Sequence, residues 1–411
     1  MAGLGLAAPL GIRAQPKEPD PYEGPYYAVF NASGGWDTSY LMDPKGTEGI
    51  NRLYREGDIL TEGKIPFAPN SKHIEKGLSN EDFFKRYATD LLVFNGLDYS
   101  VNNHSPCARY MATGKLDSSS YPTFAALVAA CKGPACPLAF LTFGNYSATG
   151  NLVPMARIPY LPTLKQVGNA DSPGGSHRYH DDFVLDRIEG ALKDRIDSRL
   201  SKTLLPRVER AESMLYAAQV NSRALQRTIP FINPNPPKER LNQQAEIALA
   251  SFKAGVCVSA NLTISQFDSH ANNDRDQMKL LPEFLAGIDY IIRRAEELKI
   301  REKLVIIIQS EMGRRPLYNK GDGKDHWSIG SIMFMGQGIR GNRVIGKTDG
   351  EQFLVPIDSK THQTDPENGV RVRPEHIHQL LRQHAGIDRH PFSKKFDLKI
   401  KPDQEVASWW A

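Results

Sequence analysis

The chain has 411 residues, of which 40% are hydrophobic and 24% are charged, as is usual for globular proteins. Its formal net charge of +4 is small and spread along the sequence, which gives no electrostatic case for nucleic-acid binding. The sequence has no run of about eighteen apolar residues, so we expect no membrane-spanning segment.

The first 25 residues resemble the remnant of an export signal followed by a spacer. Residues 1–14 are small and apolar, and a polar, Pro-rich stretch follows them. This order matches the h-region and small-residue end of a signal, although a basic n-region does not precede it. A flexible tail without function is the alternative. The pattern favours a protein that is exported to the periplasm or the cell exterior.

The cysteines agree with export. Cys131 and Cys136 flank the short loop KGPA, which a disulfide could close, and such bonds persist in oxidising compartments. Two free thiols in a turn are the alternative. Cys107 and Cys257 have no evident partner from their spacing, and Cys257 lies in an apolar segment, where a buried and inert thiol is expected.

From residue 26 onwards, apolar runs alternate with amphipathic segments. Short runs rich in Ile, Val and aromatic residues predict strands at 26–30, 91–100, 137–143, 256–265, 304–308 and 331–335. Helical spacing predicts helices at 80–90, 123–132, 239–253, 274–299 and 374–385. We also expect a hairpin around RVIG at 343–346 and a charged helical insertion at 181–229, split by Pro206. The alternation predicts a single α/β domain over 26–411, a three-layer α/β/α sandwich around a mainly parallel sheet.

Residues typical of metal ligands follow several of the predicted strands. In open α/β sheets, ligands bind outside the carboxyl ends of the strands. Carboxylates and imidazoles at that edge suit a divalent cation such as Zn, Mn, Mg or Ca. Side chains two residues apart in an extended segment point to the same side, so the two ends of an Asp-x-His pair could reach one ion. The candidates are Asp37, Asp268, His270, Glu311, Asp325 and His326.

Each of these candidates also has a structural alternative. A lone Asp or His is more often a turn residue, Glu311 could pair with Arg314 in a solvated loop, and Asp325 could begin a turn. However, several carboxylates at one edge of a sheet would repel one another without a cation. We therefore favour a metal site over a set of unrelated turns.

The segment HSPCAR, from His104 to Arg109, predicts the start of a helix. Ser105 is expected at the N-cap and Pro106 at the first helical position, with Gly114 ending the helix. A hydroxyl at that end lies where the helix favours an anion such as phosphate or sulfate. Arg109, one turn further on, could clamp the same anion. A purely structural cap is the alternative role of Ser105.

Four segments resemble, in the same order, the motifs of the domain-of-unknown-function 1501 (DUF1501) family of bacterial proteins. They are GGWD at 34–37, QFDSH at 266–270, SEMGRRP at 310–316 and GKDHW at 323–327. The second differs from the usual GWD-Thr-His of the family but keeps both potential ligands. Members are often exported by the twin-arginine route, and the resemblance implies this route although the twin arginines are not in this chain.

The resemblance implies an alkaline phosphatase-like fold, because the family is placed in the alkaline phosphatase and sulfatase superfamily. It also implies two divalent ions at the carboxyl edge of the sheet, beside a nucleophile at a helix start. The positions that match are Asp268, His270 and His326 for one ion, Asp37 and Glu311 for the second, and Asp325 near both.

By the same resemblance, Ser105 is the nucleophile, and Arg109 and Arg314 offset negative charge on the substrate. The implied protein is an exported, metal-dependent hydrolase of phosphate or sulfate esters. Its substrate would be a small anionic ester or a sulfated or phosphorylated polymer. The alternative is a non-catalytic surface or scaffold protein that retains a structural metal site on the same fold.

Overall fold

The computed structural model describes residues 20–144, 146–169, 171, 177–202, 205–208 and 225–410. These residues form an eight-stranded sheet with the order β12-β4-β11-β8-β1-β7-β5-β6. Its strands are β1 (Tyr26–Ala32), β4 (Leu92–Asp98), β5 (Phe140–Thr142), β6 (Met155–Ala156), β7 (Ser259–Ile264), β8 (Leu304–Ser310), β11 (Ile329–Gly336) and β12 (Arg343–Ile345). Pairs of shorter strands form small sheets: β2 (Leu60–Glu62) with β3 (Ile65–Phe67), β9 (Gly313–Arg314) with β10 (His326–Trp327), and β13 (Lys347–Thr348) with β14 (Leu354–Val355).

The large sheet is mainly parallel. Strand β1 pairs in parallel with β7 and β8, β5 with β6 and β7, and β12 with β4. Strand β11 runs antiparallel to its neighbours β4 and β8. The carboxyl ends of β1, β4, β7 and β8 therefore lie at one edge of the sheet, and the six strands expected from the apolar runs are confirmed.

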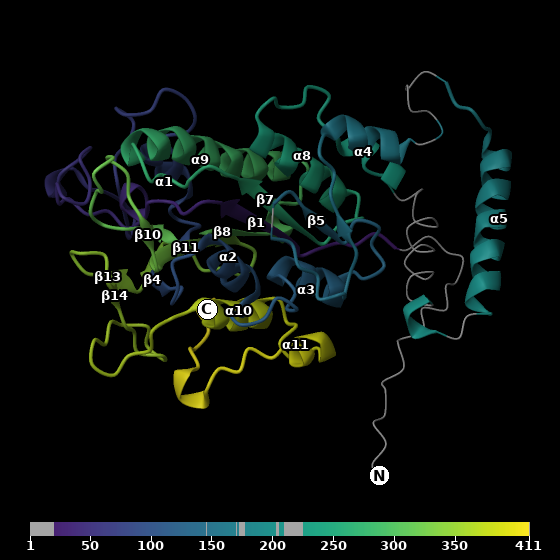
Figure 1. Ribbon diagram of the computed structural model, residues 1–411. Coiled ribbons are helices and arrows are strands. Elements are labelled where there is room, and N and C mark those ends of the chain that lie inside the picture. The colour runs from purple at the N-terminus through teal and green to yellow at the C-terminus, as the bar shows by residue number, and fades with distance from the viewer. Residues whose placement is uncertain are drawn as a thin grey trace, which may run out of the picture.

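Helices cover both faces of the sheet (Figure 1). On one face lie α1 (Asn80–Tyr87), α4 (Leu161–Gly168), α8 (Arg240–Lys253) and α9 (Asn273–Glu297). On the other lie α2 (His104–Thr113), α3 (Phe124–Lys132), α10 (Pro374–His384) and α11 (Pro391–Lys395). Strand β1 separates two cores, because Tyr26, Ala28 and Phe30 pack on the first face and Tyr27 and Val29 on the second. The predicted three-layer α/β/α sandwich is confirmed.

The segment RVIG does not form the hairpin that its glycines suggested. Strand β12 pairs in parallel with the edge of β4, whereas β13 pairs with β14. Strand β4 already occupies the position beside β11, so the chain crosses over it and adds β12 on the far side. The turn at Gly336 and Gly338, both with positive φ, turns the chain out of β11.

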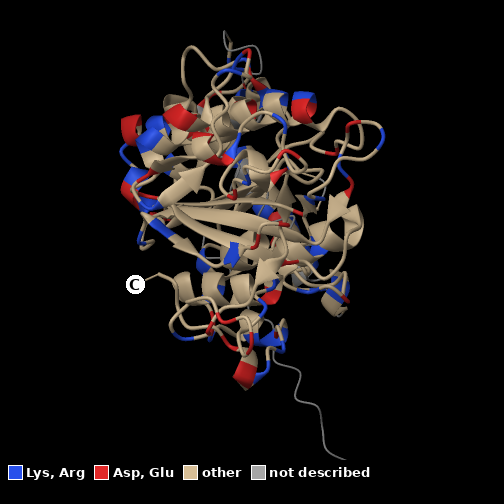
Figure 2. Cartoon of the chain, turned by 90° about the vertical axis from the view of Figure 1, so that its left-hand side faces the viewer, with Lys and Arg blue, Asp and Glu red and all other residues tan. Residues whose placement is uncertain are grey.

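Helix α5 (Asp182–Leu200) stands beside the layered body in Figure 1 and forms the first part of the predicted insertion. Residues 209–224 of that insertion, and residues 1–19 of the predicted export segment, lie outside the described residues. Among the described helices, none combines the length and the apolar character needed to cross a bilayer. Basic and acidic positions are mixed over the side of the molecule shown in Figure 2.

Cys131 and Cys136 are free thiols, so the disulfide expected between them is not formed in this structure. The Cys136 thiol is instead 3.8 Å from the carbonyl oxygen of Gly255, in a different part of the chain. Burial raises the pKa of both thiols to about 11. Cys257 is buried, as its apolar surroundings predicted.

A buried histidine in α10 should make the stability of the protein depend on pH. His378 is 2% exposed and its Nε2–H donates to the carbonyl oxygen of Met111 at 2.8 Å. Burial lowers its pKa to about 3, whereas an unfolded histidine titrates near ~6.5. Between these two values the unfolded chain binds the extra proton. His378 should therefore cost the fold about 1.4 kcal/mol per pH unit as the pH falls below 6.5.

The measurement is the free energy of unfolding in urea between pH 7.5 and pH 5, for the wild type and for His378→Gln. Glutamine keeps an N–H donor but does not titrate. We expect the wild type to lose stability more steeply than the variant below pH 6.5. Parallel profiles for the two proteins would show that His378 is not buried in its neutral form.

Candidate metal centre

The candidate centre lies at the edge of the sheet where four strands end. His104 opens α2 beyond β4, and Asp268 and His270 follow β7. His326 lies in β10. This strand pairs with β9, which follows β8 in the chain. The turn after β1 packs against the same loops, with Gly34 beside the backbone of Asp268 and Gly35 beside the side chain of Arg314, and both glycines have positive φ. Segments distant in sequence therefore meet at the carboxyl edge, as the strand-end rule predicts.

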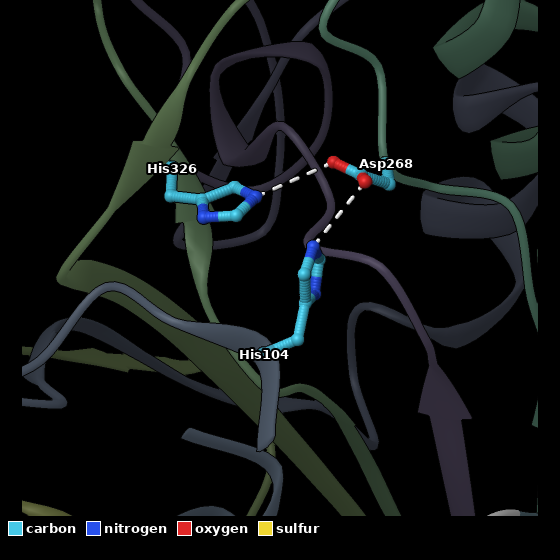
Figure 3. Close-up of side chains that lie close together, drawn as sticks. All are labelled: His104, Asp268 and His326. Carbon is cyan, nitrogen blue, oxygen red and sulfur yellow. Dashed lines mark ion pairs between the residues drawn. The ribbon is translucent and has the colours of Figure 1, made fainter. Parts of the chain in front are cut away.

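Three imidazoles surround the carboxylate of Asp268. The Nε2 atom of His104 lies 3.3 Å from Oδ2, and the Nε2 atoms of His270 and His326 lie 3.1 and 3.4 Å from Oδ1. The Nε2 atoms of His270 and His326 are 3.0 Å apart. Figure 3 shows His104 and His326 approaching different oxygens of Asp268. All three histidines thus present the same ring nitrogen to one point.

The other ring nitrogen of each histidine contacts an acceptor. Nδ1 of His104 lies 3.3 Å from Glu311 Oε1, and Nδ1 of His270 lies 3.1 Å from Asp325 Oδ1. Nδ1 of His326 lies 2.8 Å from the carbonyl oxygen of Asn102. An acceptor at Nδ1 favours the tautomer in which Nε2 carries a free lone pair. Metal-binding histidines are held in this way by their outer contacts.

These residues fit a divalent metal ion. Ligand atoms of His104, Asp268 and His326 all lie within 4.8 Å of one another. A tetrahedral site with ligands about 2.0–2.1 Å from the ion has ligand–ligand separations of about 3.3 Å, close to the spacings seen here. Moreover, His104 Nε2 is buried and makes no hydrogen bond to any described residue, although Asp268 Oδ2 is near. A buried nitrogen left in this state has the geometry of a ligand.

The charges around the centre keep Asp268 ionised. Burial would raise the pKa of its carboxyl, but the Arg314 guanidinium and the nearby imidazoles hold that pKa below its ordinary value. The hydrogen bond to Glu311, together with the charge of Asp268, raises the pKa of His104. Burial lowers the pKa of His326, which favours its neutral form. An anionic Asp268 beside a neutral imidazole is the protonation state that a metal ion requires.

Arg314 is buried beneath the centre and does not face the cleft. Its Nε donates to the carbonyl oxygen of Gly35 at 2.8 Å, and Nη1 donates to that of Lys324 at 3.0 Å. Nη2 donates to the carbonyl oxygen of Gly34 and, at 2.9 Å, to Asp268 Oδ1. Every guanidinium nitrogen is therefore engaged inside the protein. This arrangement departs from the expectation that Arg314 offsets charge on a substrate, because the side chain instead joins the loops that carry the site.

Asp37 also lies apart from the three histidines. Its carboxylate forms an ion pair of 2.7 Å with Lys324, and both side chains are fully buried. Asn273 and Ser39 donate to the same carboxylate. The structure thus brings Asp268, His270 and His326 together, places Glu311 and Asp325 at the outer nitrogens of two histidines, and puts Asp37 in a separate polar cluster.

Ser105 and Arg109 line a cleft of about 540 Å³ next to the centre, together with His104 and Glu311. The helix begins two residues earlier than expected, with Asn103 at the N-cap and no side-chain cap. Ser105 is therefore not the cap, and its exposed side chain stands inside the first turn. The N–H groups of the first turn have no partner within the helix, so Pro106 fits there as well. The predicted end at Gly114 is confirmed, with φ of 70°.

His104 and Lys324 belong to this region of the structure, although neither was among the predicted site residues. His104 follows a predicted strand, and the strand-end rule that selected Asp268 would have selected it too. However, the adjacent Ser105-Pro106 pair is typical of a helix start, so this segment was interpreted as a helix cap. Lys324 stands next to Asp325 in GKDH, but a lysine in a loop is usually solvated, and its burial became evident from the structure alone.

The turn at Gly34 should be intolerant of any side chain. Its φ is +119°, and a Cβ there would overlap the backbone of Phe267 and Asp268. We expect Gly34→Ala to destabilise the fold by about 2–4 kcal/mol, from backbone strain and overpacking, and to weaken metal binding. Gly57→Ala is the matched control, since a Cβ at Gly57 meets nothing within 4 Å. Urea unfolding of both variants tests this, and equal stability would contradict the close approach of the two loops.

Comparison with known proteins agrees with the motifs. Residues 215–399 match the sequence model of a family described as a protein of unknown function, DUF1501. The resemblance to the DUF1501 family is confirmed. The DUF1501 match includes Asp268, His270 and His326, whereas His104 and Asp37 precede it. A search of the curated proteins finds no match.

Solved structures that are similar to this chain include a sulfatase and a synthase. The sulfatase PsFucS1 from Pseudoalteromonas sp. is 9% identical, with a TM-score of 0.40 over 94% of this chain and 73% of that chain. The lipoteichoic acid synthase LtaP from Listeria monocytogenes is 8% identical, with a TM-score of 0.37 over 94% of this chain and 74% of that chain.

Proposed function

We propose that the protein is a metal-dependent hydrolase of phosphate or sulfate esters. The observation that carries this proposal is the arrangement of three histidines around Asp268, each with Nε2 directed inward and Nδ1 held by an acceptor. This arrangement adjoins a cleft large enough for a small substrate. Perturbed titratable groups beside a cleft are typical of catalytic sites.

In this proposal, His104, Asp268 and His326 hold the ion, with His270 completing the set. Imidazole-rich sites favour Zn over Ca or Mg, which prefer oxygen ligands. A bound divalent ion would act as a Lewis acid towards an ester oxygen and would lower the pKa of an adjacent hydroxyl. Glu311 and Asp325 orient His104 and His270, rather than binding the ion themselves.

The cleft supplies the other parts of the reaction. Ser105 is exposed in the first turn of α2, one residue after a proposed ligand, and the positive end of the helix favours an anionic ester there. Arg109 lines the same cleft and donates through Nε to the carbonyl oxygen of Leu116 at 3.0 Å. That bond holds the guanidinium at the wall of the cleft. We propose Ser105 as the nucleophile and Arg109 as the group that binds the transferred anion.

Export to the periplasm or cell exterior, by the twin-arginine route, is part of the same proposal. It is supported by the apolar residues 1–14 and by the motifs shared with an often exported family. A small anionic ester, or a sulfated or phosphorylated polymer, would be the substrate. Fractionation of cells that produce the protein from its natural gene tests the location.

The test of function is a panel of aryl phosphates and aryl sulfates, assayed with Zn²⁺, Mn²⁺, Mg²⁺ or Ca²⁺. We expect turnover of at least one ester with Zn²⁺ or Mn²⁺, its loss in EDTA, and its loss in Ser105→Ala with metal binding unchanged. Asp117→Asn, at an exposed position away from the cleft, is the control. Metal binding without turnover of any ester would favour the scaffold alternative, in which the ion is structural.

A further inference from the structure

Asp37 and Lys324 form an ion pair inside the protein, close to the proposed centre but separate from it. Lys324 Nζ donates to Asp37 Oδ2 at 2.7 Å, and neither side chain is exposed to solvent. Two positions after Asp37, Ser39 donates to Oδ1 through its hydroxyl at 2.6 Å and its backbone N–H at 3.1 Å. Asn273 donates to Oδ2 at 3.0 Å. These donors occupy the sites at which an ionised carboxylate accepts hydrogen bonds.

The surroundings of Lys324 are those of a fixed cation. Its ammonium lies 5.4 Å from the ring centre of Tyr40 and 5.1 Å from that of Tyr318, where ring faces attract positive charge. Its own carbonyl oxygen accepts from Arg314, whose Nη2 donates in turn to Asp268. The side chain of Lys324 therefore contacts Asp37, whereas Arg314 joins the backbone of Lys324 to Asp268.

The family resemblance assigns Asp37 to a second metal ion, and this chain does not fit that assignment. A divalent ion at Asp37 would have to displace the ammonium from its 2.7 Å contact. It would leave Lys324 buried without an acidic partner, which is strongly unfavourable in a water-excluded site. The ion would also stand beside two existing positive charges. Glu311, the other residue assigned to that ion, accepts from His104 and from the backbone N–H of Gly34 instead.

We infer that the centre holds one divalent ion, bound by the histidines and Asp268, and that the ammonium of Lys324 supplies the second positive charge at the edge of the sheet. This inference rests on the proposed metal-dependent function and states how many metal ions each chain binds. Asp37 is then a positioning residue, because it holds Lys324 and the turn after β1 in place. A lysine in this role makes the second charge part of the chain and independent of metal supply.

The experiment is a calorimetric titration with Zn²⁺, combined with elemental analysis after gel filtration. The full chain is compared with the double variant Asp37→Asn/Lys324→Met, which removes both charges together, and with Asp268→Asn. We expect one Zn²⁺ per chain in the wild type and one in the double variant, with Kd values within about threefold, and none in Asp268→Asn. Two ions in the wild type, with one lost in the double variant, would overturn the inference and leave the hydrolase proposal standing. No ion in the wild type would overturn both.

Urea unfolding shows whether the pair acts as proposed. Lys324→Met alone leaves a buried carboxylate without its cation. We expect it to raise the unfolding equilibrium constant at least about 100-fold, and we expect the double variant to recover most of that loss. If Lys324→Met were as stable as the wild type, the ammonium could not be the fixed partner of Asp37.

Discussion

Asp268→Asn should abolish metal binding while leaving the protein folded. The carboxylate contacts all three histidines, at 3.1 to 3.4 Å, and it also forms an ion pair with the buried Arg314. Asparagine keeps the shape but removes the charge. Because loss of an outer contact alone costs 10–100-fold in metal affinity, loss of this ligand should weaken Zn²⁺ binding by more than about 100-fold.

Calorimetric titration with Zn²⁺ measures this directly, and thermal unfolding confirms that the variant is folded. The side chain of Asp268 is 42% exposed, so its replacement should disturb the fold little. Asp117→Asn is the control. Asp117 is an exposed carboxylate that follows α2 in the sequence and lies outside the site. Zn²⁺ binding by Asp268→Asn with the affinity of the wild type would contradict the assignment of this residue.

Arg314→Lys should cost the protein about 1–3 kcal/mol of folding free energy for each buried carbonyl oxygen that is left without a donor. Arginine donates in three directions here, to carbonyl oxygens of the turn after β1, to that of Lys324 and to Asp268. A lysine ammonium is a compact charge without this planar fork and cannot reach all of these acceptors. Buried carbonyl oxygens would then lose their partners, and the loops that carry the site would separate.

The adjacent Arg315 provides the control, because its side chain is exposed. We expect Arg315→Lys to change the free energy of unfolding by less than about 0.5 kcal/mol. Urea unfolding of both variants, followed by Zn²⁺ titration of whichever remain folded, distinguishes the two positions. Comparable stability of Arg314→Lys and the wild type would mean that the guanidinium does not join the loops.

Much of the fold could be predicted from sequence because its strongest signals are local. The run Leu304 to Ile308 is apolar without interruption, as a strand covered on both faces must be, and it became the buried strand β8. The hairpin expected at RVIG failed for a non-local reason. The segment pairs with β4 because β4 is the edge strand beside β11. Residues 343–346 alone do not indicate which strand is available to pair with them.

The candidate site was likewise predicted where the signal is local and not where it depends on contacts between distant residues. The rule that ligands gather at strand ends found Asp268, His270 and His326, because it requires the order of strands and loops and nothing more. It could not tell which atom of each side chain faces which partner. Glu311 and Asp325 were therefore predicted as metal ligands. In the structure they contact the Nδ1 atoms of His104 and His270. Helix α2 also starts two residues earlier than predicted, which puts Ser105 inside the first turn and makes His104 the first helical residue.

The central claim is that imidazoles and Asp268 hold a divalent ion at the carboxyl edge of the sheet. X-ray absorption at the zinc edge, on protein loaded with one Zn²⁺ per chain, tests it most directly. We expect nitrogen and oxygen ligands at about 2.0–2.1 Å, with the outer scattering of at least two imidazole rings, and loss of this signal in Asp268→Asn. A zinc environment made of oxygen ligands alone, without imidazole scattering, would contradict it.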